Sequence, residues 1–103
     1  MKNDAVCLTL IAARNLRDEL FDYLSEQGDL VSGFTASDAA GHGANVLLQT
    51  PSERVKGHAD QVLVRIILQR ASAERLLERV RVSFAGTNVV YWVTPVTDFG
   101  TIA

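Results

Sequence analysis

The sequence contains few of the residues that mark disulfide-stapled, zinc-binding or catalytic proteins. Cysteine occurs once, at Cys7, so no disulfide can form within the chain. No CxxC pair or Cys/His spacing typical of a zinc site is present, and neither an HExxH motif nor a Walker phosphate loop occurs. No Ser-His-Asp or Cys-His arrangement is legible. We therefore expect a protein that is not an enzyme.

The chain also lacks a long apolar run and a strong charge imbalance. The N-terminal segment MKNDAVCLTLIAA is too short to span a membrane, and Asp4 precedes its apolar run, which is unlike a signal peptide. A formal net charge of −2 provides no general attraction to nucleic acid or to an anionic membrane. These features predict a cytoplasmic protein that binds no nucleic acid.

The length of 103 residues favours one domain, residues 1–103. A chain of this size buries roughly 60–70% of its unfolded surface, which is enough for one core. Hydrophobic residues make up 48% of the chain and charged residues 21%, which is typical of a folded protein.

Apolar patterning predicts the element order β-α-β-loop-β-α-β. The expected strands are Ala5–Ala13, Leu30–Ala36, Asp60–Leu68 and Val89–Val96. Pro95 cannot donate a ladder hydrogen bond, so the last strand is expected to lie at a sheet edge or to end there.

Two amphipathic helices are predicted between these strands. The first is expected to follow an N-cap at Asn15 and to stop at Gly28. The second is expected to follow an N-cap at Ser72 and to continue to about Phe84, with its arginines and glutamates on the solvated side.

The stretch Ser37–Ala59 is predicted to be a long loop between the second and third strands. Within it, Asn45–Thr50 has the composition of a short strand. Closing about 23 residues instead of about 4 costs only about 1.5 kcal/mol more, so the fold tolerates the loop. Ordering it costs about 1 kcal/mol or more per residue. We expect a loop that is mobile when empty and ordered by a ligand or partner.

Two strand–helix–strand units predict a ferredoxin-like α+β sandwich, βαββαβ. Two helices cover one sheet face, yet the strands carry apolar residues on both. If five or six of these side chains stayed exposed to water, the protein would lose on the order of 10 kcal/mol of burial free energy. This loss predicts a homo-oligomer that packs its sheet faces together. The expected residues of this second face are Cys7, Ile11, Val31, Leu63, Ile67 and one of two sets in the last strand, Val89-Tyr91-Val93 or Val90-Trp92.

This topology resembles the PII signal-transduction superfamily and its CutA-type relatives, and most closely the DUF3240 family, which is often found beside heavy-metal efflux systems. The resemblance spans the chain as topology. Locally it rests on Gly33-Phe34, on Gly41-His42-Gly43 and on ERVKG at Glu53–Gly57. It implies a homotrimer whose long T-loop contacts a protein partner, here a heavy-metal efflux transporter in the membrane, and responds to a small molecule or metal ion bound at the cleft between subunits.

One connection departs from the PII pattern. PII proteins that bind ATP carry a glycine- and lysine-rich loop between the second helix and the fourth strand. Here that connection is SFAGTN, Ser83–Asn88, with no Lys or Arg. Backbone amides at Gly86 and Thr87 are its only candidate anion donors. We therefore expect no ATP binding of the PII kind, and the sequence leaves the cofactor unidentified.

Candidate ligand- or partner-binding residues lie near the tip and at the returning base of the long loop. Charged loop residues are also compatible with simple solvation, so both interpretations stay open. The candidates are Gly41, His42, Gly43, Glu53, Arg54, Lys56 and Gly57.

A divalent-metal site is the second hypothesis, with His42, His58 and Asp60 as ligands. His42 has flexible glycine neighbours, and neutral imidazole is a common metal ligand. His58 and Asp60 are two residues apart, which places them on the same side of an extended chain. Ordinary polar roles at a loop and a strand edge are the alternative. Cys7 is interpreted as an inert small hydrophobic residue, with a thiolate ligand or redox sensor as the alternative.

Three functions follow from these observations. The chain is a PII-like trimeric sensor or regulator, a CutA-type metal-binding protein, or an interaction module whose loop docks a protein without a small ligand.

Overall fold

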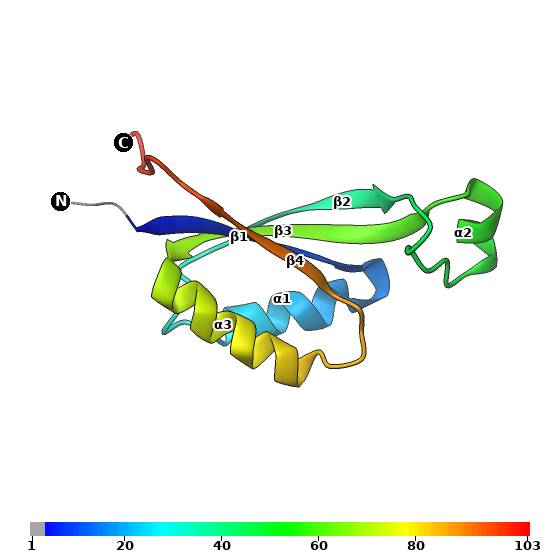
Figure 1. The fold of residues 1–103 in the computed structure, drawn as a ribbon, viewed down its shortest axis with the longest axis horizontal. Helices are drawn as coiled ribbons and strands as arrows, with labels where there is room; N and C mark the ends of the chain where they lie inside the picture. The colour runs from blue at the N-terminus through cyan, green and yellow to red at the C-terminus, as the bar shows by residue number, and fades with distance from the viewer. Residues whose placement is uncertain (1–3) are drawn as a thin grey trace.

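A computed structural model describes residues 4–103 and shows one antiparallel sheet with two helices packed on one of its faces (Figure 1). The sheet order is β2-β3-β1-β4, and every neighbouring pair is antiparallel. This order confirms the ferredoxin-like prediction and places Pro95 in an edge strand. The strands are β1 (Ala5–Ala13), β2 (Thr35–Gly41), β3 (Ala59–Gln69) and β4 (Val90–Pro95).

The centre of the sheet is the β1–β3 pair, in which buried residues alternate along both strands. Side chains of one parity face the helices and build the core, as predicted. Those of β1 are Val6, Leu8, Leu10 and Ala12, and those of β3 are Val62, Val64, Ile66 and Leu68.

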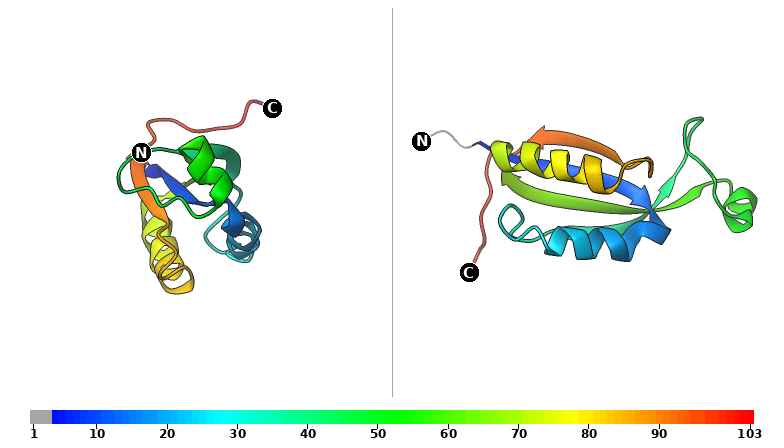
Figure 2. Two further views of the ribbon diagram at one scale, coloured as in Figure 1. Left: turned by 90° about the vertical axis from the view of Figure 1, so that its right-hand side faces the viewer. Right: turned by 90° about the horizontal axis from the view of Figure 1, so that it is seen from below.

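Two helices cover this inner face and lie side by side beneath the sheet (Figure 2). A 3-10 turn, η1 (Arg14–Leu16), leads into α1 (Arg17–Ser25), which buries Leu20 and Leu24 one turn apart. The second covering helix is α3 (Arg70–Ser83), which buries Ala73, Leu76, Leu77 and Val80.

The predicted helix caps are wrong. Asn15 lies inside the 3-10 turn, and neither Leu16 at the start of α1 nor Gln69 at the start of α3 makes a side-chain cap. Ser72 lies inside α3, and α1 ends at Ser25, before Gly28. The residues predicted as caps therefore do not lie at the ends of these helices.

The second strand also begins later than predicted. Leu30 and Val31 are buried in the core within the turn that follows α1, where both amides donate to the Gln27 carbonyl. The strand itself, Thr35–Gly41, has few apolar side chains and is mostly exposed. Its pairing with β3 is set by backbone hydrogen bonds, so apolar periodicity did not reveal it.

Within residues 4–103, no helix covers the outer face of the sheet (Figures 1 and 2). Thr9 pairs with Trp92, and Ile11 pairs with both Leu63 and Val90, so these side chains share this face. Val90 and Trp92 remain 54% and 42% exposed. Of the two alternatives for the last strand, the Val90-Trp92 set is the outer one. Val31, which was also assigned to this face, lies in the core instead.

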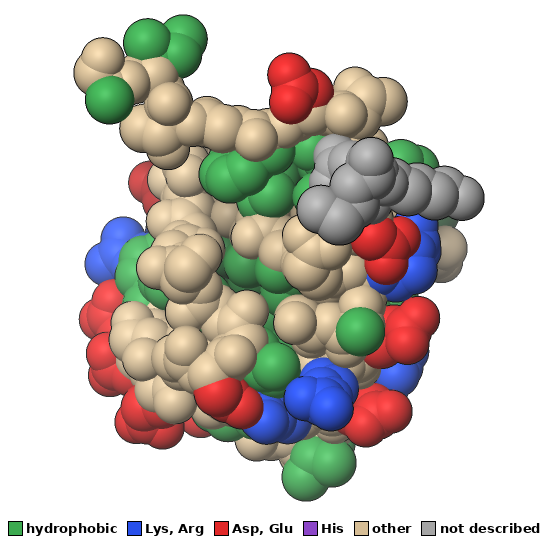
Figure 3. Space-filling model, turned by 90° about the vertical axis from the view of Figure 1, so that its left-hand side faces the viewer, with side chains coloured by type: hydrophobic (Ala, Val, Ile, Leu, Met, Phe, Trp, Pro, Cys, Tyr) green, Lys and Arg blue, Asp and Glu red, His purple; other side chains and the backbone are tan. Residues whose placement is uncertain are grey.

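The chain ends in a tail, residues 96–103, which crosses the end of the sheet farthest from the β2–β3 connection (Figures 1 and 2). Figure 3 shows this end of the molecule, where hydrophobic side chains are exposed among polar ones. Phe99 is 64% exposed and Ile102 is fully exposed. No helix within residues 4–103 is long and apolar enough to cross a membrane.

Candidate functional site

The connection between β2 and β3, residues 42–58, forms an arm that extends beyond the end of the sheet (Figure 1). The arm is shorter than predicted, because residues 37–41 belong to β2. It carries a short helix, α2 (Pro51–Lys56), whereas Asn45–Thr50 forms no strand. The predicted long loop over Ser37–Ala59 is therefore wrong at its start, which belongs to β2, and at Pro51–Lys56, which is helical. The short strand predicted at Asn45–Thr50 is wrong as well.

The α2 helix begins with a complete capping box. The Thr50 side chain accepts from the Glu53 amide at 3.1 Å, and Glu53 in turn accepts from the Thr50 amide at 3.2 Å. Pro51 occupies the first turn, where its missing N–H has no cost. Gly57 ends the helix with φ of 80°, a conformation that favours glycine.

Glu53 does more than cap the helix. Its carboxylate also accepts from the Gln49 amide at 2.6 Å and from the Asp60 amide at 2.5 Å. It thereby joins the start of the arm helix to the start of β3, and its side chain is buried. Hydrogen bonds from the Asp60 and Gln49 amides hold the pKa of Glu53 below its ordinary value, although burial acts in the opposite direction.

Arg14 anchors the base of the arm from the end of β1. Its guanidinium donates to the Ala39 carbonyl at 3.0 Å and to the Gln61 carbonyl at 3.3 Å, which spans β2 and β3. The same group lies 3.5 Å from an Asp38 oxygen and 3.7 Å from an Asp60 oxygen. Sequence reasoning missed this residue, because only the sheet order brings β1 and β2 to the same end of β3.

The predicted metal ligands are brought near one another. The rings of His42 and His58 lie 5.3 Å apart, and His58 Nε2 lies 3.7 Å from an Asp60 oxygen. Asp60 is already paired with Lys56, whose Nζ lies 2.9 and 3.0 Å from its two oxygens. This contact is the main cause that holds the pKa of Asp60 below its ordinary value. Within residues 4–103, no group of three or more His, Cys, Asp and Glu side chains is arranged to hold a metal ion.

Two of the remaining predicted residues are glycines that the local geometry requires, and Arg54 is an exposed side chain. Gly41 ends β2, and a Cβ there would collide with the Gln61 carboxamide, so this glycine leaves room for that side chain. Gly43 has φ of 132°, which other residues rarely adopt. Arg54 is exposed on α2. Beside it, Val55 is 88% exposed, an apolar surface residue that the sequence analysis did not single out.

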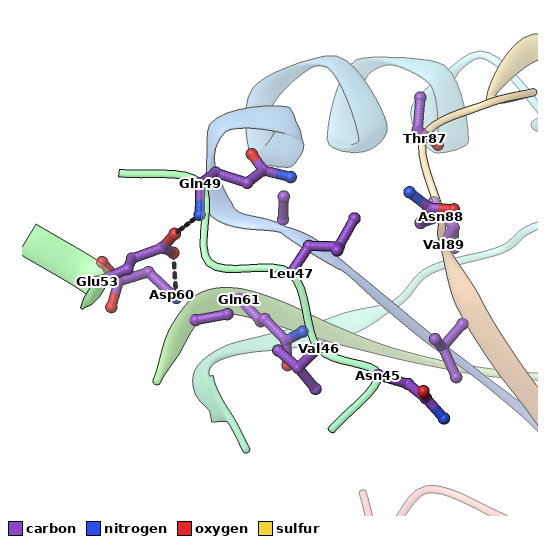
Figure 4. Close-up of a pocket in the computed structure, with 13 residues that line it drawn as sticks. Asn45, Val46, Leu47, Gln49, Glu53, Asp60, Gln61, Thr87, Asn88 and Val89 are labelled. Carbon is purple, nitrogen blue, oxygen red and sulfur yellow. Dashed lines mark hydrogen bonds between the residues drawn. The ribbon is translucent and has the colours of Figure 1, made fainter. Parts of the chain in front are cut away.

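A pocket of about 450 Å³ lies between the arm, the start of β3 and the segment that leads into β4 (Figure 4). We call it the loop-base pocket. Its arm residues are Asn45, Val46, Leu47, Gln49 and Glu53; the others are Ala13, Ala59, Asp60, Gln61 and Thr87–Val90. Apart from Glu53, Asp60 and the backbone amide of Thr87, these residues were not predicted as site residues. The sequence feature that could have indicated some of them is the Gly86-Thr87-Asn88 segment, whose composition is typical of a turn.

Comparison with known proteins identifies the family. The model of the family described as "Protein of unknown function (DUF3240)" matches residues 2–103. The chain belongs to the DUF3240 family. No curated protein sequence matches this DUF3240 protein significantly.

Solved structures extend the comparison to the fold. A DUF3240 family protein from Shewanella baltica OS155 has a TM-score of 0.78 at 20% identity, covering 98% of this chain and 99% of its own. CPII, a nitrogen regulatory PII-like protein from Thiomonas intermedia K12 with bound ADP, AMP and bicarbonate, has a TM-score of 0.70 at 18% identity, covering 95% and 96%. The chain described in this structure therefore has the PII-like fold, as its sequence predicts.

The buried carboxylate of Glu53 generates the first prediction. Because its pKa is lower in the folded than in the unfolded chain, its contribution to arm stability is complete above the ordinary value of 4.5 and is lost as pH falls through the folded value. In an acid titration followed by NMR, we expect the Gln49, Thr50 and Asp60 amide shifts to move together with a midpoint below 4.5.

Glu53→Gln is the matched control, because it keeps the shape of the side chain and removes the titration. The common transition at the three amides should disappear in this variant. A midpoint at or above the ordinary value in the native protein would contradict the assignment.

Proposed function

We propose that this DUF3240 protein is a small regulatory protein of the PII type. Its arm contacts a protein partner, and the loop-base pocket receives a small effector that changes how the arm is held. The arm that carries its own capped helix out beyond the sheet is the observation on which this proposal rests. The PII-like fold supports it, because CPII shares that fold and is a nitrogen regulatory protein.

The position of the pocket supports coupling between effector and partner. One wall of the pocket belongs to the arm, through Leu47 and Gln49, and another belongs to the segment before β4, through Thr87 and Asn88. A ligand that contacts both walls stabilises one placement of the arm over others, by the difference in its affinity for the two placements. The predicted mobility of the empty arm fits this role and stays a prediction.

Exposed residues of α2 suit the arm for docking. Val55 is an exposed apolar side chain next to Arg54, which carries a charge without an ion pair among the described residues. We take a heavy-metal efflux transporter as the partner, on the resemblance of the sequence to proteins found beside such systems. The helix would present these side chains to the transporter.

The uncovered outer face of the sheet supports assembly into a homotrimer. Trp92 and Val90 are exposed there beside half-buried Ile11, Leu63 and Ile67. Apolar side chains grouped on one face are stabilised by burial against another copy. In such a trimer the loop-base pocket, whose Ala13, Gln61 and Val90 share this face, would lie close to the neighbouring subunit.

Docking through α2 predicts a position-specific loss of partner binding. Val55→Glu places a charge on the arm, and we expect retention on membranes that contain the efflux transporter to fall about tenfold or more, as at interface hot spots. Val82→Glu is the matched control, because Val82 is 80% exposed on α3, away from the arm. Equal retention of both variants would exclude α2 as the docking element.

The outer face predicts the oligomeric state. Light scattering at micromolar concentration should give about three times the chain mass of 11.2 kDa. Trp92→Glu buries a charge at the proposed contact and should yield monomer, while Val82→Glu should leave the trimer intact. A native protein that scatters as a monomer would rule out the trimer.

A second candidate function is divalent-metal binding of the CutA type, which the contact between His42 and His58 favours. Two imidazoles that meet across the base of the arm supply two nitrogen ligands. Asp60 would complete the set only after release from Lys56.

Calorimetric titration with copper, zinc, nickel and cobalt separates this function from the first. The His42→Ala/His58→Ala double variant should lose binding at least about tenfold, because imidazole nitrogens are main ligands of these metals. Lys56→Ala should tighten binding, since it frees Asp60. Unchanged binding in the double variant would refute the metal site.

A further inference from the structure

The side chains that line the loop-base pocket carry no positive charge. Among its described lining residues, none is Lys or Arg, and two are the carboxylates Glu53 and Asp60. The pKa values of both carboxyls are held below their ordinary values, so both are ionised near neutral pH. The lining therefore offers an anionic ligand no cationic side chain. Of its two carboxylates, Asp60 is paired with Lys56 outside the lining, and Glu53 is held by three backbone amides.

The two carboxylates are also poorly placed to recruit a cation. One oxygen of Glu53 accepts from the Gln49 and Thr50 amides, and the other accepts from the Asp60 amide. Both oxygens of Asp60 accept from Lys56 Nζ. A bound cation would have to displace one of these existing partners.

Nearby anion-binding groups are engaged as well. Arg14 lies outside the lining, and its guanidinium is held by the Ala39 and Gln61 carbonyls and by two aspartates. The Thr87 amide, one of the two candidate anion donors, donates to the Phe84 carbonyl at 3.2 Å. The turn before β4 therefore uses at least this amide for its own fold.

Four carboxamides surround the same space: Asn45, Gln49, Gln61 and Asn88 (Figure 4). They come from the arm, from β3 and from the segment before β4. Within residues 4–103, none of these side-chain amides takes part in a hydrogen bond. Each can supply two N–H donors and an accepting oxygen. Together they match a ligand whose edge carries donors and acceptors alternately.

The rest of the lining is apolar. Leu47, Val46, Val89 and Val90 supply aliphatic surface, and the small side chains of Ala13 and Ala59 keep the pocket open. Apolar walls with a few converging polar groups are typical of small-molecule sites, and the volume of about 450 Å³ is within their usual range.

From this combination we propose that the loop-base pocket binds an uncharged, planar small molecule with an amide-like edge, and that it discriminates against phosphorylated compounds. The inference rests on the proposed function, because it names the class of effector for the same pocket. It also distinguishes this DUF3240 protein from CPII, whose structure contains ADP and AMP.

A graded series of probes tests the charge preference. Adenosine is uncharged, planar and rich in donors and acceptors, and AMP and ADP add negative charge without changing its base. In calorimetric titrations of the full chain, we expect adenosine to bind and affinity to fall at each added phosphate. Tighter binding of ADP than of adenosine would overturn the proposal. The proposal would also fail if neither adenosine nor nicotinamide, a second uncharged planar probe that carries an amide, bound to the protein.

Pocket variants show whether the lining causes the preference. Asn88 has φ of 61°, so Asn88→Gly removes the carboxamide and keeps the backbone conformation. We expect it to weaken adenosine binding up to about tenfold, the value of a net hydrogen bond. Gln49→Lys adds a cation and should reverse the order of adenosine and AMP, whereas Val82→Lys on α3 should not. An unchanged order in Gln49→Lys would show that lining charge does not set the preference.

Hydrogen exchange of residues 42–58 in the same samples separates this inference from the proposed function. Protection of the arm by adenosine supports both. Protection by ADP with tighter ADP binding overturns the ligand class and leaves the regulatory function standing. Binding of adenosine without any change in the arm supports the ligand class and contradicts the regulatory coupling.

Discussion

The Glu53 carboxylate holds together the end of this molecule that carries the candidate site. It accepts hydrogen bonds from the Gln49, Thr50 and Asp60 amides, so one buried side chain joins the start of α2 to the start of β3. A carboxylate accepts several backbone amides at once, which a neutral side chain of the same size does less strongly. Because Gln49 and Asp60 also line the loop-base pocket, the shape of that pocket depends on this one group.

The sheet topology brings the other residues of the candidate site to the same end of the sheet as Glu53. Ala13 at the end of β1 pairs with Gln61 near the start of β3, and Ile11 pairs with Val90 at the start of β4. Antiparallel pairing thus brings the base of the arm and the entrance to β4 to one end of the sheet. Arg14 reinforces that end by bonding to carbonyls of both β2 and β3. The uncovered outer face begins at the same place, which links the pocket to the surface proposed for assembly.

Patterning predicted the parts of the fold that are built by apolar burial. β1 and β3 and the two covering helices were found because their buried residues recur with regular spacing. The prediction placed β2 too early because its side chains are mostly polar or small. Leu30 and Val31, the first residues of the predicted strand, instead lie in a turn and fill the core. The α2 helix was missed although Thr50 and Glu53 have the spacing of a capping box, because the surrounding stretch lacks an apolar stripe.

The sequence by itself determined the order of the main elements, the core face of the sheet and the region of the chain that holds the candidate site. Those properties follow from local spacing of apolar side chains and from turn residues. Only the tertiary structure decided that the buried Glu53 joins α2 to β3, that Arg14 lies at the base of the arm and that Asn88 and Gln49 share a pocket. Each of these depends on strand pairing between distant segments, which no local pattern encodes.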